Sequence, residues 1–315
     1  MATFIASTAT SPLGCSGSAF GHAASAGLAC LEQAGITAAD IDVLINVGVY
    51  RDSNIVEPAV AALVQKRIGI NLDYLRSLDR RAAFSFDLMN GACGMLNAVQ
   101  VADALLSTSS ARRVLVVSAD THPSTDLSQA GTAEFPYAST GGALLLEHAS
   151  DACGFGRVHH RSVPGGHGIN GYLPLRDVGA DGRNSIVVAR EADVLDRMLD
   201  LAVDSVLGVL PVDAASSPER LQAAFDRTLL VTSQPSPDFA VLLAKRLGLA
   251  SDAAVTLEGI HGDPHTSALV HGYRQAEGTG WLTAHDQVLF VAVGAGLTSA
   301  ASLYRLPTHR EGVVQ

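Results

Sequence analysis

The chain has 315 residues, of which 48% are hydrophobic and 17% are charged, so it can bury at least one large core. Its formal net charge is -10 and no run of basic residues is longer than two, which argues against a nucleic-acid-binding surface. The N-terminal segment lacks the basic and apolar regions of a signal peptide, and no apolar stretch is long enough to span a membrane. We therefore expect a cytoplasmic protein without a membrane partner.

The hydrophobic pattern alternates between helical stretches and short apolar strands, which is typical of an α/β fold. In the first half the pattern predicts helix 19–33, strand 43–47, helix 58–68, strand 84–88, helix 95–107 and strands 114–119 and 142–146. Residues 154–183 are rich in Gly, His and Arg and predict loops or an irregular hairpin. The second half predicts helices 193–208 and 218–225, strand 227–231, helices 238–247 and 266–277, and strand 287–293.

The two halves resemble each other. Residues 41–70 and 225–249 each read as a buried strand, a polar turn and a helix that ends in K-R-x-G-[IL]. Gene duplication explains this match, and it divides the chain into an N-terminal half, 1–150, and a C-terminal half, 151–315. Two copies of such a unit usually pack with their sheets together and place a site where loops of both copies meet.

Cys93 is the candidate nucleophile of the first half. A hydrophobic strand ends before it, Asn90 and Gly91 form a tight turn, and a helix begins at or just after the cysteine. The positive end of a helix dipole favours a thiolate, so this position suits an attacking sulfur. The alternative is a buried core cysteine at a helix start.

His265 holds the matching place in the second half and is the candidate base, because a neutral imidazole can take a proton from a thiol, an alcohol or an amine. The alternative is a loop or capping histidine. Asp263 is placed to orient the imidazole, although an Asp before a proline also forms turns. The turn that contains Ala295 has backbone N–H groups that can hold an oxyanion together with the N–H of Cys93. The cysteines lack paired metal-ligand spacing, so we expect neither a metal nor a cofactor.

Several segments together resemble the thiolase superfamily, and in particular the β-ketoacyl carrier-protein synthase III group. They are AGITAADIDVLINVG, FDLMNGACGMLNAVQVADALL followed by VLVVSAD, YASTGGALLLE, AKRLGL and the C-terminal VAVGAGLTSAASLYRL. The resemblance implies a duplicated, five-layered α/β/α/β/α fold. It also implies that Cys93 accepts an acyl group and that the N–H groups of Cys93 and Ala295 form the oxyanion hole.

The sequence departs from that family at two catalytic positions. Ser233, in S-Q-P-S, stands where the family has a histidine, and His265, in P-H-T-S, stands where it has an asparagine. We therefore expect Ser233, Gln234 and Thr266 to line the pocket beside Cys93 and His265. The pair of donors used for decarboxylative condensation is broken by these changes.

These departures favour an acyltransferase. It would load an acyl group from acyl-CoA or an acyl carrier protein onto Cys93 and pass it to a small-molecule alcohol or amine, in natural-product biosynthesis, with His265 as base. One alternative is a carbon–carbon condensing enzyme with altered Cys-His machinery. Another is a non-catalytic subunit that completes a heterodimer with an active paralogue. The resemblance implies a dimer, and we expect a homodimer.

Overall fold

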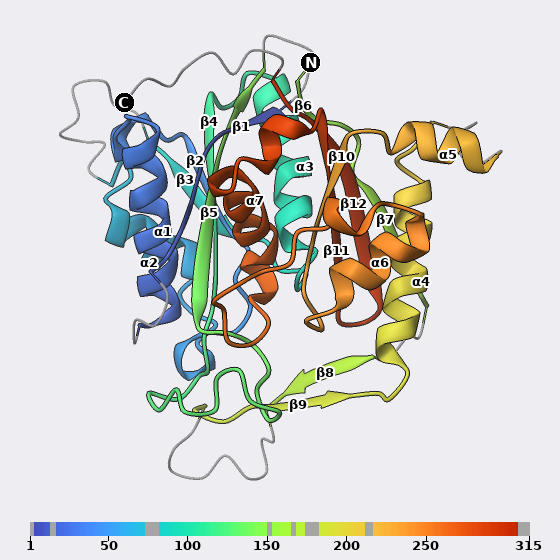
Figure 1. Cartoon of the computed structure of the whole chain (residues 1–315). Helices are drawn as coiled ribbons and strands as arrows, with labels where there is room; N and C mark the ends of the chain where they lie inside the picture. Colours follow the sequence, from blue (N-terminus) through green and yellow to red (C-terminus); the bar gives the residue numbers. More distant parts are fainter. Residues whose placement is uncertain are drawn as a thin grey trace.

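The structure is a computed structural model, and it describes residues 3–12, 17–72, 82–149, 153–164, 168–173, 183–211 and 217–307. The predicted boundary between the halves at residue 150 lies outside the described residues. Figure 1 shows two sheets that stand face to face, with helices between them and on both outer sides.

The first sheet belongs to the N-terminal half and has the strand order β1-β5-β4-β2-β3. Its strands are β1 (Thr3–Thr10), β2 (Val43–Asn46), β3 (Phe84–Asp87), β4 (Arg113–Asp120) and β5 (Thr140–His148). Strand β2 runs parallel to β3 and β4, whereas β5 is antiparallel to β1 and β4. Its outer face packs against α1 (Ala19–Gln33) and α2 (Val60–Ile68) in one apolar cluster.

The second sheet repeats this arrangement. It contains β10 (Thr228–Thr232), β11 (Gln287–Gly294), β12 (Thr298–Arg305), β6 (Gly154–Phe155) and β7 (His159–Ser162), of which the last two both pair with β12. Helices α4 (Val194–Leu207) and α6 (Phe239–Leu247) cover its outer face, and α5 (Pro218–Ala224) lies beside them. Strands β8 (Ile169–Tyr172) and β9 (Val187–Arg190) form a separate hairpin.

The central layer consists of α3 (Gly94–Ser107) and α7 (Ala268–Gly278). Residues of both helices share one core cluster with the inner faces of both sheets. The order of layers is therefore helices, sheet, helices, sheet, helices, as the thiolase-like prediction required (Figure 1). Within the described residues, no helix is long and apolar enough to cross a bilayer.

The repeated K-R-x-G motif has the same structural role in both halves. Gly69 follows α2 with φ +87°, and Gly248 follows α6 with φ +73°, so both helices end in a left-handed residue. Only glycine adopts that conformation without strain, which explains why the glycine recurs.

The predicted elements agree with the structure except at a few places. Strands β1, β9 and β12 were not predicted as strands, and α2 begins at Val60 rather than at residue 58. Strands β6, β7 and β8 lie where loops or an irregular hairpin were predicted. The start of α2 is set from outside the helix, because the Asp87 carboxylate on β3 accepts hydrogen bonds from the backbone N–H groups of Val60 and Ala61 (3.0 and 2.8 Å). Such a distant cap leaves no signal in the local sequence.

Candidate active site

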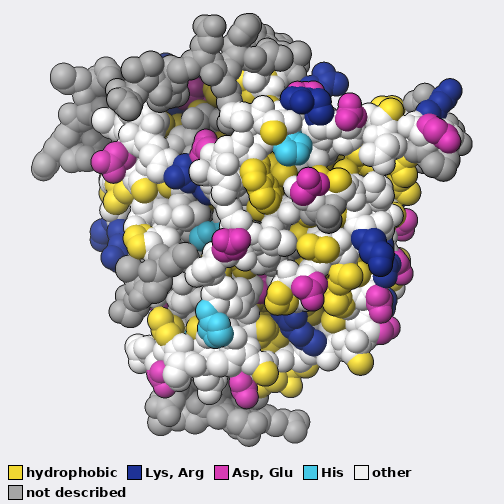
Figure 2. Space-filling model, in the orientation of Figure 1, with side chains coloured by type: hydrophobic (Ala, Val, Ile, Leu, Met, Phe, Trp, Pro, Cys, Tyr) yellow, Lys and Arg dark blue, Asp and Glu magenta, His cyan; other side chains and the backbone are white. Residues whose placement is uncertain are grey.

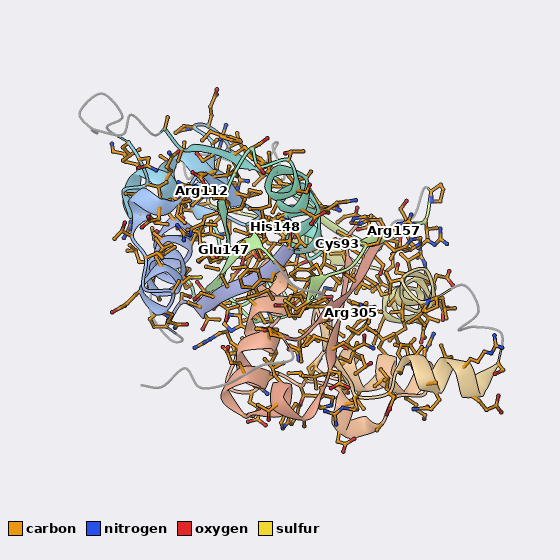
Figure 3. The ribbon with its side chains drawn as sticks, turned by 90° about the horizontal axis from the view of Figure 1, so that it is seen from above. Cys93, Arg112, Glu147, His148, Arg157 and Arg305 are labelled. Atoms are coloured by element: carbon orange, nitrogen blue, oxygen red, sulfur yellow. The ribbon has the colours of Figure 1, made fainter. Side chains whose placement is uncertain are left out.

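Cys93 immediately precedes α3 in the interior between the two halves (Figure 3). Its side chain is completely buried and belongs to the central core cluster. The sulfur points toward the hairpin of β11 and β12, where the thiol lies 3.5 Å from the carbonyl oxygen of Ala292 and 3.7 Å from that of Thr298. These backbone carbonyls, rather than a substrate-facing space, are the neighbours of the thiol.

This environment does not favour a thiolate. Burial raises the pKa of the Cys93 thiol to about 12, although hydrogen bonds from the β12 region act in the opposite direction. The expectation that the helix start would lower this pKa is wrong. A helix dipole is worth at most about 2 kcal/mol, which does not offset the cost of charging a fully buried sulfur.

The turn before α3 places its free donors one residue earlier than expected. The N–H of Cys93 donates to the carbonyl of Asn90 (3.1 Å), so it is not free for an oxyanion. The N–H of Ala92 donates no hydrogen bond to a described residue. Gly294 lies next to this nitrogen, because a Cβ added to Gly294 would be 3.5 Å from it. The N–H of Ala295, in the turn after β11, is also without a described acceptor. The backbone N–H groups without a described acceptor are therefore that of Ala92, in the turn before α3, and that of Ala295, in the glycine turn after β11.

His265 is the residue that the structure brings to this turn from the second half. A Cβ added to Gly91 would lie 3.6 Å from His265 Nε2, so this edge of the imidazole faces the turn before Cys93. The residue is 6% exposed, and its ring lies between Tyr50 and Tyr137, with centroid distances of 5.3 and 4.5 Å. Its backbone has φ +49°, a left-handed conformation that is uncommon for a residue other than glycine.

Asp120, at the end of β4, is the carboxylate that faces the imidazole. Its Oδ2 lies 3.3 Å from His265 Nδ1. It also accepts hydrogen bonds from the backbone N–H groups of Val49, Tyr50 and Thr266 and from the Thr266 hydroxyl. Burial opposes the charged form of each partner, but their mutual attraction outweighs it. The pKa of Asp120 is lowered and the pKa of His265 is raised.

Asp263 has a different role from the predicted one. Its Oδ1 accepts a hydrogen bond from the backbone N–H of His265 (2.8 Å), while Asp120 faces the ring. Burial raises the pKa of Asp263 to about 6. Asp263 thus fixes the backbone turn. Sequence reasoning missed Asp120 because it lies 145 residues from His265 in the chain, and the segment VLVVSAD that ends with it gives no local sign of a histidine partner.

A pocket of about 450 Å³ adjoins Asp263 and is lined by Gln234, Arg190 and His261 among others. Of the three predicted pocket residues, only Gln234 lines it. The Ser233 hydroxyl instead accepts a hydrogen bond from the N–H of Val293 (2.9 Å), and the Thr266 hydroxyl is held by Asp120. Both hydroxyls join elements of the fold and do not face this pocket.

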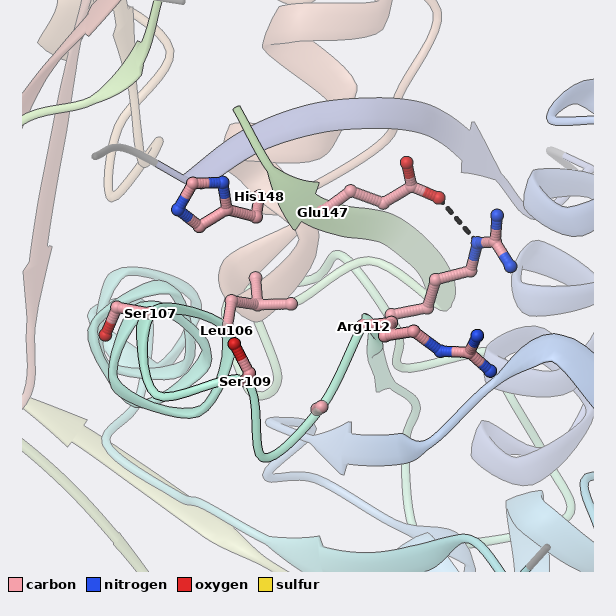
Figure 4. Close-up of a pocket in the computed structure, with 8 residues that line it drawn as sticks. Leu106, Ser107, Ser109, Arg112, Glu147 and His148 are labelled. Atoms are coloured by element: carbon pink, nitrogen blue, oxygen red, sulfur yellow. Dashed lines mark hydrogen bonds and ion pairs between the residues drawn. The ribbon is translucent and has the colours of Figure 1, made fainter. Parts of the chain in front are cut away.

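A second cavity, of about 430 Å³, lies at the other end of α3 (Figure 4). It is lined by Arg112 and His148, and by Glu147, whose carboxylate binds Arg113 Nε (2.6 Å). The 14 residues of α3 separate this cavity from Cys93 by about 20 Å along the helix axis, at 1.5 Å per residue. It is therefore not part of the candidate site.

The described residues contain no group of three or more His, Cys, Asp or Glu side chains that could hold a metal ion. On the face shown in Figure 2, basic side chains are scattered among acidic and apolar ones.

Comparisons with known proteins agree with this architecture. Residues 86–163 match the family of 3-oxoacyl-[acyl-carrier-protein] synthase III. The β-ketoacyl-[acyl-carrier-protein] synthase III of Erythrobacter litoralis is 28% identical over 292 residues, covering 87% of this chain and 80% of the relative. The corresponding synthase of Rhizobium rhizogenes is 27% identical, covering 88% and 81%.

Solved structures show the same fold. FabH of Pseudomonas aeruginosa superimposes with a TM-score of 0.77 at 18% identity, covering 98% of this chain and 99% of FabH. The chain is similar in sequence to the ketosynthase III group and has the thiolase fold. OleA of Xanthomonas campestris, solved with bound lauric acid and lauroyl-CoA, superimposes with a TM-score of 0.74 at 17% identity, covering 96% of this chain and 99% of OleA. The chain thus combines this fold with Ala92, Cys93 and His265 at the centre between its two halves.

Proposed function

We propose that this ketosynthase III-like chain is the non-catalytic subunit of a heterodimeric condensing enzyme, whose partner carries the acyl group. The observation that carries the proposal is the position of Cys93. Its sulfur is buried against backbone carbonyls, and the residue next to the glycine turn is Ala92, whose methyl group cannot attack a thioester. Acylation of Cys93 would require the turn and the start of α3 to rearrange.

The edge of the first sheet supports a partner of the same fold. Strand β3 is the last strand of that sheet and leads directly into the turn before Cys93. Within the described residues no strand pairs with its outer edge, and Phe84 on this strand is 53% exposed. Met89 and Val56 are 54% and 65% exposed. The buried Arg51 contacts the Met89 sulfur and the carbonyl of Ile55, the residue before Val56. An open strand edge with apolar side chains suits pairing with another sheet.

The relatives are named as synthases that act with acyl carrier protein. We therefore infer that the heterodimer joins acyl units delivered as acyl-CoA or acyl-carrier-protein thioesters, and that the partner provides the nucleophilic cysteine. The heterodimer replaces the homodimer that we expected from the sequence.

Intact-protein mass measurement after incubation with acetyl-CoA, hexanoyl-CoA and lauroyl-CoA tests this proposal. We expect no mass gain for the wild type or for Cys93→Ala, and an acyl mass gain for Ala92→Cys, because the free N–H groups of Ala92 and Ala295 remain in place. A mass gain in the wild type that disappears in Cys93→Ala would contradict the proposal. Co-expression with a thiolase-fold paralogue that has a cysteine at the equivalent of Ala92 should give a stable heterodimer on sedimentation.

A second candidate is the acyltransferase that would use Cys93 and His265 to acylate an alcohol or amine. The observation in its favour is the Asp120–His265 pair, because a histidine oriented by a carboxylate is typical of acyl-transfer sites. In that case Cys93 would become acylated, and His265→Ala would still load the acyl group but would not deliver it. The same mass experiment separates the two candidates.

A further inference from the structure

Each half of the fold has a cavity where its central helix ends and the next strand begins. In the N-terminal half the α3 cavity, of about 430 Å³, is lined by residues of segments 106–113 and 147–148 (Figure 4). In the C-terminal half the α7 cavity, of about 400 Å³, is lined by residues of segments 282–286 and 306–307 and by Arg227. Because the two cavities occupy equivalent places in the two halves, their shape alone does not indicate a ligand.

In the α7 cavity the arginine and the histidine both have partners. Arg227 Nε lies 2.8 Å from a carboxylate oxygen of Asp286. His285 Nδ1 donates a hydrogen bond to the carbonyl of Trp281 (2.8 Å). The ion pair between Arg227 and Asp286 is neutral overall, so the lining of this cavity does not favour an anion.

The α3 cavity has basic side chains without such partners. Arg113 Nε binds Glu147 (2.6 Å), which neutralises that carboxylate. The side chains of Arg112 and His148 also line the cavity, and neither has a hydrogen-bond or ion-pair partner among the described residues. Arg112 directly precedes β4, whereas the residue that directly precedes β11 is the acidic Asp286. The same position thus carries opposite charges in the two halves, and of the two cavities it is the α3 cavity that attracts an anion.

The end of α3 does not oppose an anion in this cavity. The last carbonyl groups of a helix present partial negative charge when they are free. Here the carbonyl of Leu105 accepts hydrogen bonds from the backbone N–H groups of Ser110 (2.9 Å) and Ala111 (3.2 Å). The carbonyl of Leu106 accepts a hydrogen bond from the backbone N–H of Ser109 (3.1 Å). Ser109 also lines the cavity, and its hydroxyl can donate to a bound oxygen.

The buried side of the α3 cavity is apolar. Leu106 and Ala111 line it and are 3% and 4% exposed. Figure 4 shows Leu106 between His148 on one side and Arg112 on the other. The Asp42 carboxylate accepts the backbone N–H of Arg112 (2.8 Å) and so fixes where this side chain leaves the main chain. A ligand with a charged end and a short hydrocarbon part can therefore contact both kinds of surface.

We propose that the α3 cavity binds a small monocarboxylate with a short hydrocarbon chain, without forming a covalent bond to it. The carboxylate accepts hydrogen bonds from the Arg112 guanidinium, whose planar fork matches its two oxygens, and the chain packs on Leu106 and Ala111. A monoanion fits better than a dianion, because the protein has a formal net charge of -10 and Glu147 also lines the cavity. The cavity lies about 20 Å from Cys93 along α3, so this inference does not depend on the proposed function.

NMR titration of the methyl-labelled full chain with hexanoate tests the inference. We expect the methyl signals of Leu106 and Ala111 to shift, and those of Leu282 and Leu306 in the α7 cavity to stay unchanged. Hexanamide has the same chain but no charge. It should bind roughly 10-fold more weakly or less, which is the lower limit for the loss of a hydrogen bond to a charged group.

Two arginine variants locate the charge that binds the carboxylate. Arg112→Gln should weaken hexanoate binding by a similar factor, because it removes the cation from the α3 cavity. Arg227→Gln is the matched control, since it removes the same charge from an arginine that lines the α7 cavity, and it should bind hexanoate like the wild type. Both arginines are exposed, so we expect both variants to fold.

Three results would overturn the inference: no shift at Leu106 and Ala111, equal affinity for hexanoate and hexanamide, or equal affinity of the Arg112→Gln and Arg227→Gln variants for hexanoate. Shifts with inorganic phosphate but not with hexanoate would also overturn it, because the cavity would then take a different anion. None of these results bears on the acylation of Cys93, which decides the proposed function.

Discussion

The reactivity of Cys93 toward an alkylating reagent gives the sharpest check on the candidate site. Burial raises the pKa of this thiol from 9.0 to about 12. At any pH below 9 the thiolate fraction is then about 1,000-fold smaller than for an unperturbed thiol, because each pKa unit is a factor of ten. The absence of solvent exposure slows the reaction further.

The assay is time-resolved labelling with iodoacetamide at pH 8, followed by peptide mapping by mass spectrometry. Cys153 is partly exposed and serves as the internal reference, whereas Cys30 is buried like Cys93 and its pKa is raised to about 11. We expect Cys153 to react before Cys30 and Cys93, and these two buried cysteines to react only after urea is added. If Cys93 reacts as fast as Cys153 in the folded protein, the sulfur is accessible and the argument against a nucleophilic role is refuted.

Three further predictions concern stability and are checked by urea denaturation. Burial lowers the pKa of His271 from 6.5 to about 4, so the unfolded chain binds a proton at this residue more tightly than the folded chain does. The free energy of unfolding should therefore fall by about 2 kcal/mol when the pH is lowered from 7.5 to 5. The variant His271→Gln should lack this pH dependence. Gly48→Ala should lower the free energy of unfolding by several kcal/mol or prevent folding, because the new Cβ would lie 2.3 Å from a backbone oxygen of β4. Gly278→Ala should be tolerated, because a Cβ at that position has nothing within 4 Å. Asp120→Asn should cost about 3 to 5 kcal/mol by leaving His265 without its counter-charge, whereas the exposed Asp126→Asn should show no measurable change.

Much of the fold could be read from the sequence because its elements bury one face at regular spacing. The pattern over 19–33 predicted α1 with its observed bounds, and the repeated K-R-x-G motif marked the ends of α2 and α6. Strands β1 and β12 escaped because their small and polar residues lack a clear alternation. These segments become strands because β1 pairs with β5 and β12 pairs with β11 in the folded protein.

The candidate site was only partly predictable. The motif around residues 90–94 correctly placed a turn and a helix start, and His265 was correctly expected at the corresponding junction of the second half. The sequence did not reveal that the N–H of Cys93 is used within the turn, nor that Asp120 rather than Asp263 faces the imidazole. Asp120 is 145 residues away from His265 in the chain, and only the packing of the two halves brings them together.

The sequence by itself indicated the α/β alternation, the repeated strand, turn and helix, and the resemblance to ketosynthase III, because these depend on patterns that extend over tens of residues. Only the tertiary structure decided which side chain faces the site. At the start of a helix, a shift of one residue turns a side chain by about 100°, since a turn has 3.6 residues. The direction of the Cys93 sulfur is set by the hairpin of β11 and β12 on the far side of the chain, which the local sequence around the cysteine does not encode.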